Sequence, residues 1–214
     1  MLNKLFERKL APGSHLNSPR FPRYSGGWAV LRKRLESESG LRVLDTGPIN
    51  ASNINYITDH GHSLFLSDLV HEAWSGDFAK HGDEGPQWDV QGFLKQTMEL
   101  RGHNFDLILL WTALDYLPDA LLQPVVDRLH EVMNPFGQVF ALFHTRTNGD
   151  EAVHCRFHLT PSDEVLVQLG EPLPLQRSFT NRSVERLFSA WSGQKFFLAK
   201  DALSEVIFTN LVDE

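Results

Sequence analysis

Short apolar segments alternate with helix-like segments from residue 41 onward. Residues 41–45 predict a short strand that ends in an acid, and residues 50–58 predict a helix after an intervening turn. Residues 62–66 predict a second strand, which again runs into an acid at Asp68. A strand, a helix and a second strand in so short a span favour a parallel sheet.

The most apolar segment of the chain, residues 105–111, is typical of a strand buried on both faces. Apolar residues at helical spacing then predict a helix that begins at Pro118 or Asp119 and runs to about Met133. Residues 138–143 predict the next strand. This part of the chain therefore repeats the strand, helix and strand order.

The last third of the chain has shorter patterns. Residues 154–159 and 164–169 are strand-like, and residues 180–191 predict a helix. Two short strands follow at residues 195–199 and 205–210. Their spacing predicts a closing antiparallel hairpin.

Two segments lack a clear strand pattern. Proline, glycine and serine make residues 10–27 read as irregular, ahead of a predicted helix at residues 28–39. Residues 70–104 hold a glycine- and proline-marked loop and a predicted helix at residues 88–100, but no clear strand.

The composition fits one globular domain with a short extra arm. The 214 residues are 42% hydrophobic and 22% charged, which excludes a disordered, collagenous or coiled-coil chain. No apolar stretch approaches the roughly 20 residues of a membrane helix, and the first residues make a poor secretory signal. A single cysteine, Cys155, excludes an internal disulfide framework. We therefore expect a soluble, cytoplasmic protein that does not bind membranes.

The charge is unevenly distributed. The net charge of -7 argues against a general nucleic-acid coat. Residues 1–35 nevertheless contain eight basic side chains and one acid. This segment is either a solvated arm over an acidic domain or an arm that steers an anionic substrate or a protein partner. The basic residues are Lys4, Arg8, Lys9, Arg20, Arg23, Arg32, Lys33 and Arg34.

The order of these elements resembles a known family. The first strand ends in Asp45 and is followed by Thr46 and Gly47, and Asp68 follows the second strand. Residues 105–118 resemble a fourth strand and the helix entry behind it, and residues 129–143 resemble a helix, a proline-glycine turn and a fifth strand. From residue 41 to its end the chain thus resembles the class I S-adenosylmethionine-dependent methyltransferases.

The resemblance implies an α/β fold of the Rossmann-like methyltransferase type. Such a fold is a mostly parallel twisted sheet with helices on both faces and a C-terminal antiparallel strand. We expect residues 1–40 to form the basic N-terminal arm and a helix, and residues 41–214 to form the methyltransferase-like domain.

The resemblance also implies a site for S-adenosylmethionine. In an open parallel sheet a ligand binds outside the carboxyl ends of the strands, where the strand order reverses. Gly47 would let the backbone approach the ligand, and Asp68 would accept hydrogen bonds from ribose hydroxyls. Asp45 would either face the cationic part of the cofactor or orient the turn. The candidate cofactor-binding residues are Asp45, Thr46, Gly47, Pro48, Asp68, Leu69, Trp111 and Thr112.

The sequence departs from the family pattern at two places. The family's turn carries three glycines, whereas here Gly47 stands alone and is followed by Pro48. The family's third strand has no counterpart, although residues 90–100 could supply a replacement. The altered turn leaves less room near the adenosine, and the end of the missing strand is the part of the family's fold that contacts the adenine.

Candidate catalytic side chains follow the fourth and fifth strands. Asp115 and Tyr116 stand where the methyl acceptor is expected, as a base and a stacking or hydrogen-bonding group, and His144 is a further candidate base. Packing and helix-capping roles are alternatives for these residues. Cys155 has the pattern of a small buried residue. We predict no metal site, because the ten histidines include no metal-binding signature.

Three functions stay open on the sequence. The favoured one is a methyltransferase that acts on a small molecule, because methyl transfer depends mainly on positioning and needs few fixed catalytic residues. The second is a catalytically inactive methyltransferase-like domain that binds a ligand or a protein partner, as the reduced glycine turn suggests. The third is a nicotinamide-dependent oxidoreductase, which ranks last because the chain has no G-x-G-x-x-G sequence.

Overall fold

The computed structural model describes most of the chain. The described residues are 18–82, 85–100, 102–146, 153–170, 172–198 and 201–211. The basic residues before position 18 lie outside them. In this part of the chain no helix is both long enough and apolar enough to span a membrane.

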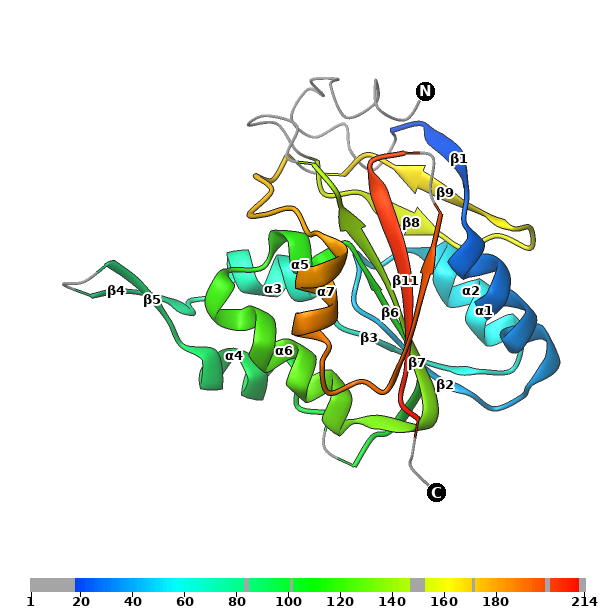
Figure 1. The fold of residues 1–214 in the computed structure, drawn as a ribbon, viewed down its shortest axis with the longest axis horizontal. Coiled ribbons are helices and arrows are strands. Elements are labelled where there is room, and N and C mark those ends of the chain that lie inside the picture. Colours follow the sequence, from blue (N-terminus) through cyan, green and yellow to red (C-terminus); the bar gives the residue numbers. More distant parts are fainter. Residues whose placement is uncertain are drawn as a thin grey trace.

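A six-stranded sheet forms the centre of the molecule (Figure 1). Its order is β10-β11-β7-β6-β2-β3, with four parallel strands from β7 to β3 and two antiparallel strands at the other edge. The fold class predicted from the sequence is therefore confirmed. The strands are β2 (Arg42–Asp45), β3 (Ser63–Leu66), β6 (Phe105–Trp111), β7 (Met133–His144), β10 (Gly193–Phe197) and β11 (Leu203–Thr209).

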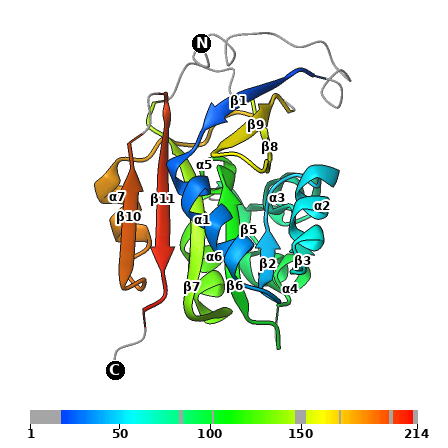
Figure 2. The same cartoon turned by 90° about the vertical axis from the view of Figure 1, so that its right-hand side faces the viewer.

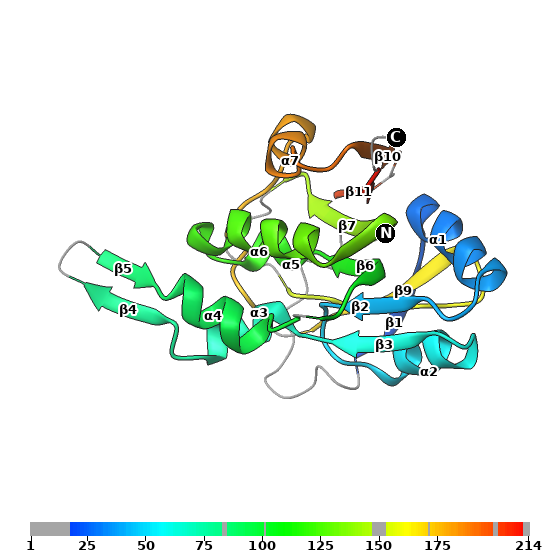
Figure 3. The same ribbon diagram turned by 90° about the horizontal axis from the view of Figure 1, so that it is seen from below.

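Helices cover both faces of this sheet. Figure 3 shows α1 and α2 on one side and α4, α6 and α7 on the other. The central strand β6 explains why both faces need cover: Leu107 and Leu109 enter one apolar cluster, and Ile108 and Leu110 enter the other. The helices are α1 (Gly26–Ser37), α2 (Ala51–Asp59), α3 (Leu69–Ser75), α4 (Val90–Thr97), α5 (Ala113–Tyr116), α6 (Asp119–Glu131) and α7 (Asn181–Leu187).

A second, three-stranded sheet lies beyond the ends of the parallel strands (Figures 1 and 2). It consists of β1 (Arg20–Tyr24), β9 (Glu164–Gln168) and β8 (Arg156–His158), in the order β1-β9-β8. The prediction that residues 10–27 are irregular is wrong at β1. That segment becomes a strand because it pairs with β9, which lies far away in the sequence.

The N-terminal elements are part of the packed core. Trp28 and Leu31 of α1 are fully buried against the sheet. In β1, the buried Arg23 forms ion pairs with Glu205, which lies on β11, and with Asp201, which lies just before it. Residues 18–37 are therefore integrated with the α/β fold by apolar burial and by a buried ion-pair network.

Residues 70–104 fold differently from the sequence-based expectation. They contain α3 and a hairpin, β4 (Ala79–Gly82) with β5 (Gly85–Trp88), that projects from the body (Figures 1 and 3). The prediction of no strand there is wrong for this hairpin. The missing third parallel strand is confirmed for the described residues, because β3 has no outer neighbour in its sheet.

Candidate functional site

The turn after β2 is organised around the carboxylate of Asp45. This side chain is only 2% exposed, and three donors reach it. Its Oδ1 accepts hydrogen bonds from the Gly47 N–H at 3.0 Å and the Trp111 indole Nε1–H at 2.7 Å. Its Oδ2 accepts one from Asn53 Nδ2 at 2.8 Å. Burial raises the pKa of Asp45, and the three hydrogen bonds oppose that shift. Both oxygens are thus already occupied by protein groups.

Trp111 covers the turn. A Cβ atom added to Gly47 would lie 2.7 Å from Trp111 Cδ1, so only a residue without a side chain fits beneath the indole. The indole stacks on the Phe157 ring, with centroids 5.1 Å apart and planes 5° apart. The backbone of Trp111 has a positive φ of 50°, which is rare for a bulky residue. Gly47 and Trp111, predicted to contact a ligand, contact each other.

Asn53 holds the second sheet above the same turn. Its Nδ2 also donates to the Phe157 carbonyl at 3.1 Å, and its Oδ1 accepts from the Leu159 N–H at 2.9 Å. The residue is 1% exposed. Asn53 was not among the predicted site residues, although a polar residue on the apolar face of a predicted helix is a signal for such a role.

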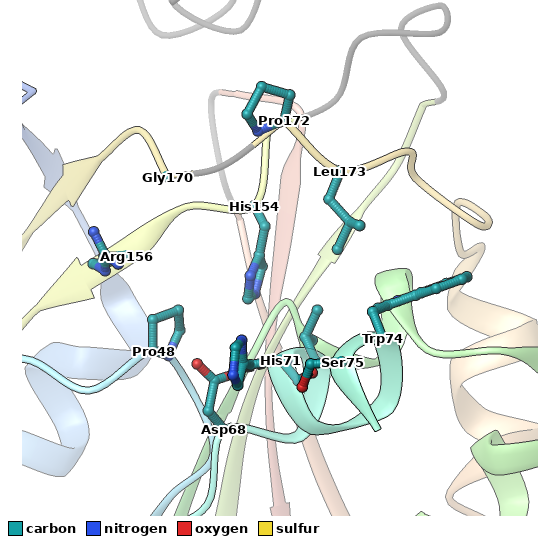
Figure 4. Close-up of a pocket in the computed structure, with 11 residues that line it drawn as sticks. Pro48, Asp68, His71, Trp74, Ser75, His154, Arg156, Gly170, Pro172 and Leu173 are labelled. Atoms are coloured by element: carbon teal, nitrogen blue, oxygen red, sulfur yellow. Dashed lines mark hydrogen bonds between the residues drawn. The ribbon is translucent and has the colours of Figure 1, made fainter. Parts of the chain in front are cut away.

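A pocket of about 290 Å³ opens beside this covered turn, at the carboxyl ends of β2 and β3 (Figure 4). Two of the predicted cofactor-binding residues, Pro48 and Asp68, line it. Its other walls come from α3, from the chain that enters β8 and from the chain that follows β9, none of which was predicted to form the site. These other lining residues are Val70, His71, Trp74, Ser75, His154, Arg156, Gly170, Pro172 and Leu173.

Asp68 caps α3 and faces the pocket. Its Oδ1 accepts a hydrogen bond from the His71 N–H at 3.0 Å. Within the described residues no hydrogen bond reaches its Oδ2. Burial raises the pKa of Asp68, while the contacts with His71 and the charge of Arg156 act in the opposite direction. One carboxylate oxygen therefore remains available to a ligand.

Arg156 and His154 form the facing wall. Two nitrogens of the Arg156 guanidinium, Nε and Nη1, are shielded from solvent and have no hydrogen-bond partner in the described part of the chain. Burial lowers the pKa of His154 to about 4, and the charges of Arg156 and His144 add to this effect. His154 is thus neutral at pH 7, and Arg156 supplies the positive charge of this wall.

Three further predicted site residues lie inside the protein. Leu69 is 0% exposed and belongs to the apolar core. The buried Thr46 hydroxyl donates to the Leu109 carbonyl at 3.1 Å. The buried Thr112 hydroxyl has no partner among the residues that the structure describes.

Asp115 and His144 form a buried pair. Asp115 Oδ2 lies 2.6 Å from His144 Nδ1 and 2.8 Å from the His144 backbone N–H. Burial raises the pKa of Asp115, and the contacts with His144 oppose the shift. A carboxylate accepts hydrogen bonds, so Asp115 orients the His144 ring through Nδ1.

Tyr116 links this pair to the pocket wall. Its ring lies 5.9 Å from that of His144 and 4.8 Å from that of His154, centroid to centroid. Its hydroxyl donates to the Val153 carbonyl at 3.0 Å. Burial raises the pKa of this phenol above its ordinary value. Tyr116 therefore contacts the pocket wall through its ring, while its hydroxyl holds the chain that carries His154.

Cys155 and the buried histidines His62 and His158 have structural contacts. Cys155 is buried, and burial raises the pKa of its thiol to about 12. His62 Nδ1 accepts from the Leu41 N–H at 3.2 Å, and its Nε2 contacts the Leu35 carbonyl at 2.8 Å. His158 Nε2 lies 2.9 Å from the side chain of Gln168.

Comparison with solved structures identifies the fold. A protein assigned to the type 11 methyltransferases from Sulfolobus solfataricus aligns with a TM-score of 0.51 at 13% identity, over 89% of this chain and 95% of that one. The chain has a methyltransferase fold. The pocket therefore lies at the ligand-binding edge of a methyltransferase fold, outside the carboxyl ends of its parallel strands. No protein-family model and no curated protein matches the sequence.

Further methyltransferase structures align at lower scores. The N-methyltransferase NodS from Bradyrhizobium japonicum WM9, in complex with S-adenosylhomocysteine, aligns with a TM-score of 0.46 at 15% identity over 97% of both chains. The 1,6-didemethyltoxoflavin-N1-methyltransferase from Burkholderia thailandensis aligns with a TM-score of 0.47 at 15% identity, over 87% of this chain and 77% of that one. This chain spans 50% to 62% of three longer matched proteins.

Proposed function

We propose that this chain binds S-adenosylmethionine in the pocket of Figure 4 and transfers its methyl group to a small-molecule acceptor. The observation that carries the proposal is Asp68, which follows β3 and lines the pocket with one carboxylate oxygen that accepts no hydrogen bond from the described residues. A carboxylate at this place can accept hydrogen bonds from two ribose hydroxyls.

The other walls suit a nucleoside as well. Pro48 and Leu173 offer apolar surface, and His154, neutral at pH 7, can donate or accept a hydrogen bond. S-adenosylmethionine supplies an electrophilic methyl group, so the main task of the protein is to position the acceptor for an in-line displacement.

His144 is the base that we assign to this reaction. Asp115 Oδ2 lies 2.6 Å from His144 Nδ1 and fixes the orientation of the imidazole. His144 does not line the pocket itself; its ring packs on Tyr116, which in turn packs on His154 of the pocket wall. Asp115 is thus a positioning residue for His144, and Tyr116 packs between the base and the pocket.

Calorimetric titration tests cofactor binding. S-adenosylmethionine and S-adenosylhomocysteine should bind at about 100 μM or tighter, roughly -5.5 kcal/mol, whereas NADH should not bind. Asp68→Ala should abolish binding, and Asp59→Ala, which removes an exposed carboxylate on α2, should leave it unchanged. No binding of either ligand at millimolar concentration would refute the proposal.

A catalytically inactive binding domain is the second candidate function. It is favoured by Trp111 and Asn53, which fill and cover the space above Gly47 with protein contacts. In this case the chain binds a nucleoside ligand in the pocket, or it binds a protein partner through the basic N-terminal arm. Incubation with methyl-labelled S-adenosylmethionine and small-molecule hydroxyl, amine and carboxylic-acid acceptors distinguishes the enzyme from the inactive domain. Cofactor binding without methyl transfer supports the inactive domain.

A further inference from the structure

Arg156 differs from Arg23 and Arg32 in how its guanidinium is paired. Arg23, which is 3% exposed, forms ion pairs with Asp201 and Glu205. Arg32 has one orphaned nitrogen, but both of its Nη atoms form ion pairs. In Arg156, both Nε and Nη1 are shielded from water and unpaired within the described residues. The positive charge of Arg156 thus has no ion-pair partner in the described part of the chain, and an anion in the pocket that Arg156 lines would supply one.

The position of Arg156 places that anion in the pocket. Arg156 begins β8 and lines the pocket together with Asp68 (Figure 4). The two side chains form no ion pair with each other in the part of the chain that the structure describes. The neighbouring His154 is neutral at pH 7 and does not share the cationic role. A ligand here thus meets one cation and one separate carboxylate.

The opposite wall is apolar and held in place. The Trp74 indole donates from Nε1 to the Tyr116 carbonyl at 2.9 Å and packs edge-on against Trp88, with centroids 5.8 Å apart. Trp74 and Leu173 both line the pocket. The ligand therefore combines an acidic group with apolar surface.

We infer that Arg156 anchors a carboxylate group of the ligand that occupies this pocket. A guanidinium fork matches a carboxylate with two parallel hydrogen bonds. A monoanion fits better than a phosphate dianion, because the pocket also contains the carboxylate of Asp68. The inference rests on the proposed function for the identity of the ligand: the carboxylate belongs to the amino-acid end of S-adenosylmethionine or to the methyl acceptor.

Matched ligands and variants test the inference by calorimetry at pH 7. S-adenosylhomocysteine is compared with 5′-methylthioadenosine, which has the same nucleoside but no carboxylate, and benzoate is compared with benzamide. Arg156→Gln should weaken the carboxylate-bearing member of a pair by at least about tenfold and its neutral counterpart by less than about twofold. Arg156→Lys, which keeps the charge but loses the fork, should fall between the two.

Arg20→Gln is the matched control. Arg20 and Arg156 flank the same residue, Gln168, from the two outer strands of the second sheet, and Arg20 does not line the pocket. The substitution Arg20→Gln removes one positive charge from the same sheet, so it should leave every affinity within about twofold of that of the unmodified protein. Thermal melting and near-ultraviolet circular dichroism establish that the variants are folded.

The outcomes separate the two proposals. Loss of S-adenosylhomocysteine affinity alone assigns the carboxylate to the cofactor, and loss of benzoate affinity alone assigns it to the acceptor. Arg156-dependent benzoate binding without any nucleoside binding supports the inference and rejects the proposed function. If no carboxylate binds the unmodified protein at millimolar concentration, or if none weakens in Arg156→Gln, the inference is wrong.

Discussion

The indole of Trp111 donates a hydrogen bond to the carboxylate of Asp45 at 2.7 Å, across 66 positions of sequence. The two residues end neighbouring parallel strands, β6 and β2. Their contact closes the turn at Gly47, where the resemblance to methyltransferases implied an open approach to a ligand. The described pocket lies to the side of this contact, between Asp68 and Arg156.

Trp111→Phe should destabilise the protein by about 1–3 kcal/mol, because the buried carboxylate of Asp45 loses one of its three donors. Urea denaturation followed by circular dichroism measures the change. The exposed Trp74, at 42%, allows a control substitution, Trp74→Phe, which should cost less. Equal costs for the two variants would mean that the Asp45 contact contributes little to stability.

Gly47→Ala should cost about 1–3 kcal/mol of stability, since the new methyl group would meet the Trp111 ring. Much of this cost should disappear when Trp111→Ala is already present, because the obstructing ring is then gone. A double-mutant cycle measures this non-additivity. Simple additivity of the two costs would contradict the close packing of these residues.

His154 should make stability depend on pH between about 4 and 6.5. Its folded-state pKa, about 4, lies below the value of 6.5 for an exposed histidine, so the unfolded chain binds more protons in this range. Stability is therefore present above pH 6.5 and is lost as the pH falls toward 4, by up to about 3 kcal/mol.

The variant His154→Gln isolates this contribution. The pKa values of Asp45, Asp68 and Asp115 are raised in the folded state, so these groups lower the stability of the protein as the pH rises, which is opposite to the effect of His154. The difference in stability between the two proteins should shrink from pH 7 to pH 4. A pH-independent difference would show that His154 titrates normally.

Arg23→Gln and Arg156→Gln should have opposite effects on the free energy of unfolding. Removing Arg23 leaves Asp201 and the buried Glu205 without their partner and should cost about 3–5 kcal/mol. Removing Arg156 relieves an unpaired guanidinium and should leave stability unchanged or raise it by about 1 kcal/mol. Chemical denaturation without ligand tests both. A large loss in Arg156→Gln would point to a structural role.

Most of the central sheet could be predicted from the sequence. The apolar run of β6 and the short strands β2 and β3 have patterns that local burial determines, and the closing hairpin of β10 and β11 follows from its spacing. In contrast, β1 could not be predicted, because its strand conformation depends on pairing with β9. The projecting hairpin of β4 and β5 has few apolar residues to reveal it.

The candidate site could likewise be predicted only in part. The sequence alone determined that Gly47 and Asp68 follow parallel strands and lie at one edge of the sheet, because strand direction and chain order place them there. Only the tertiary structure decided that Trp111 covers Gly47 and that Arg156 faces the pocket beside Asp68. Periodicity records which side chains are buried, whereas contacts between distant segments depend on the packing of the whole chain.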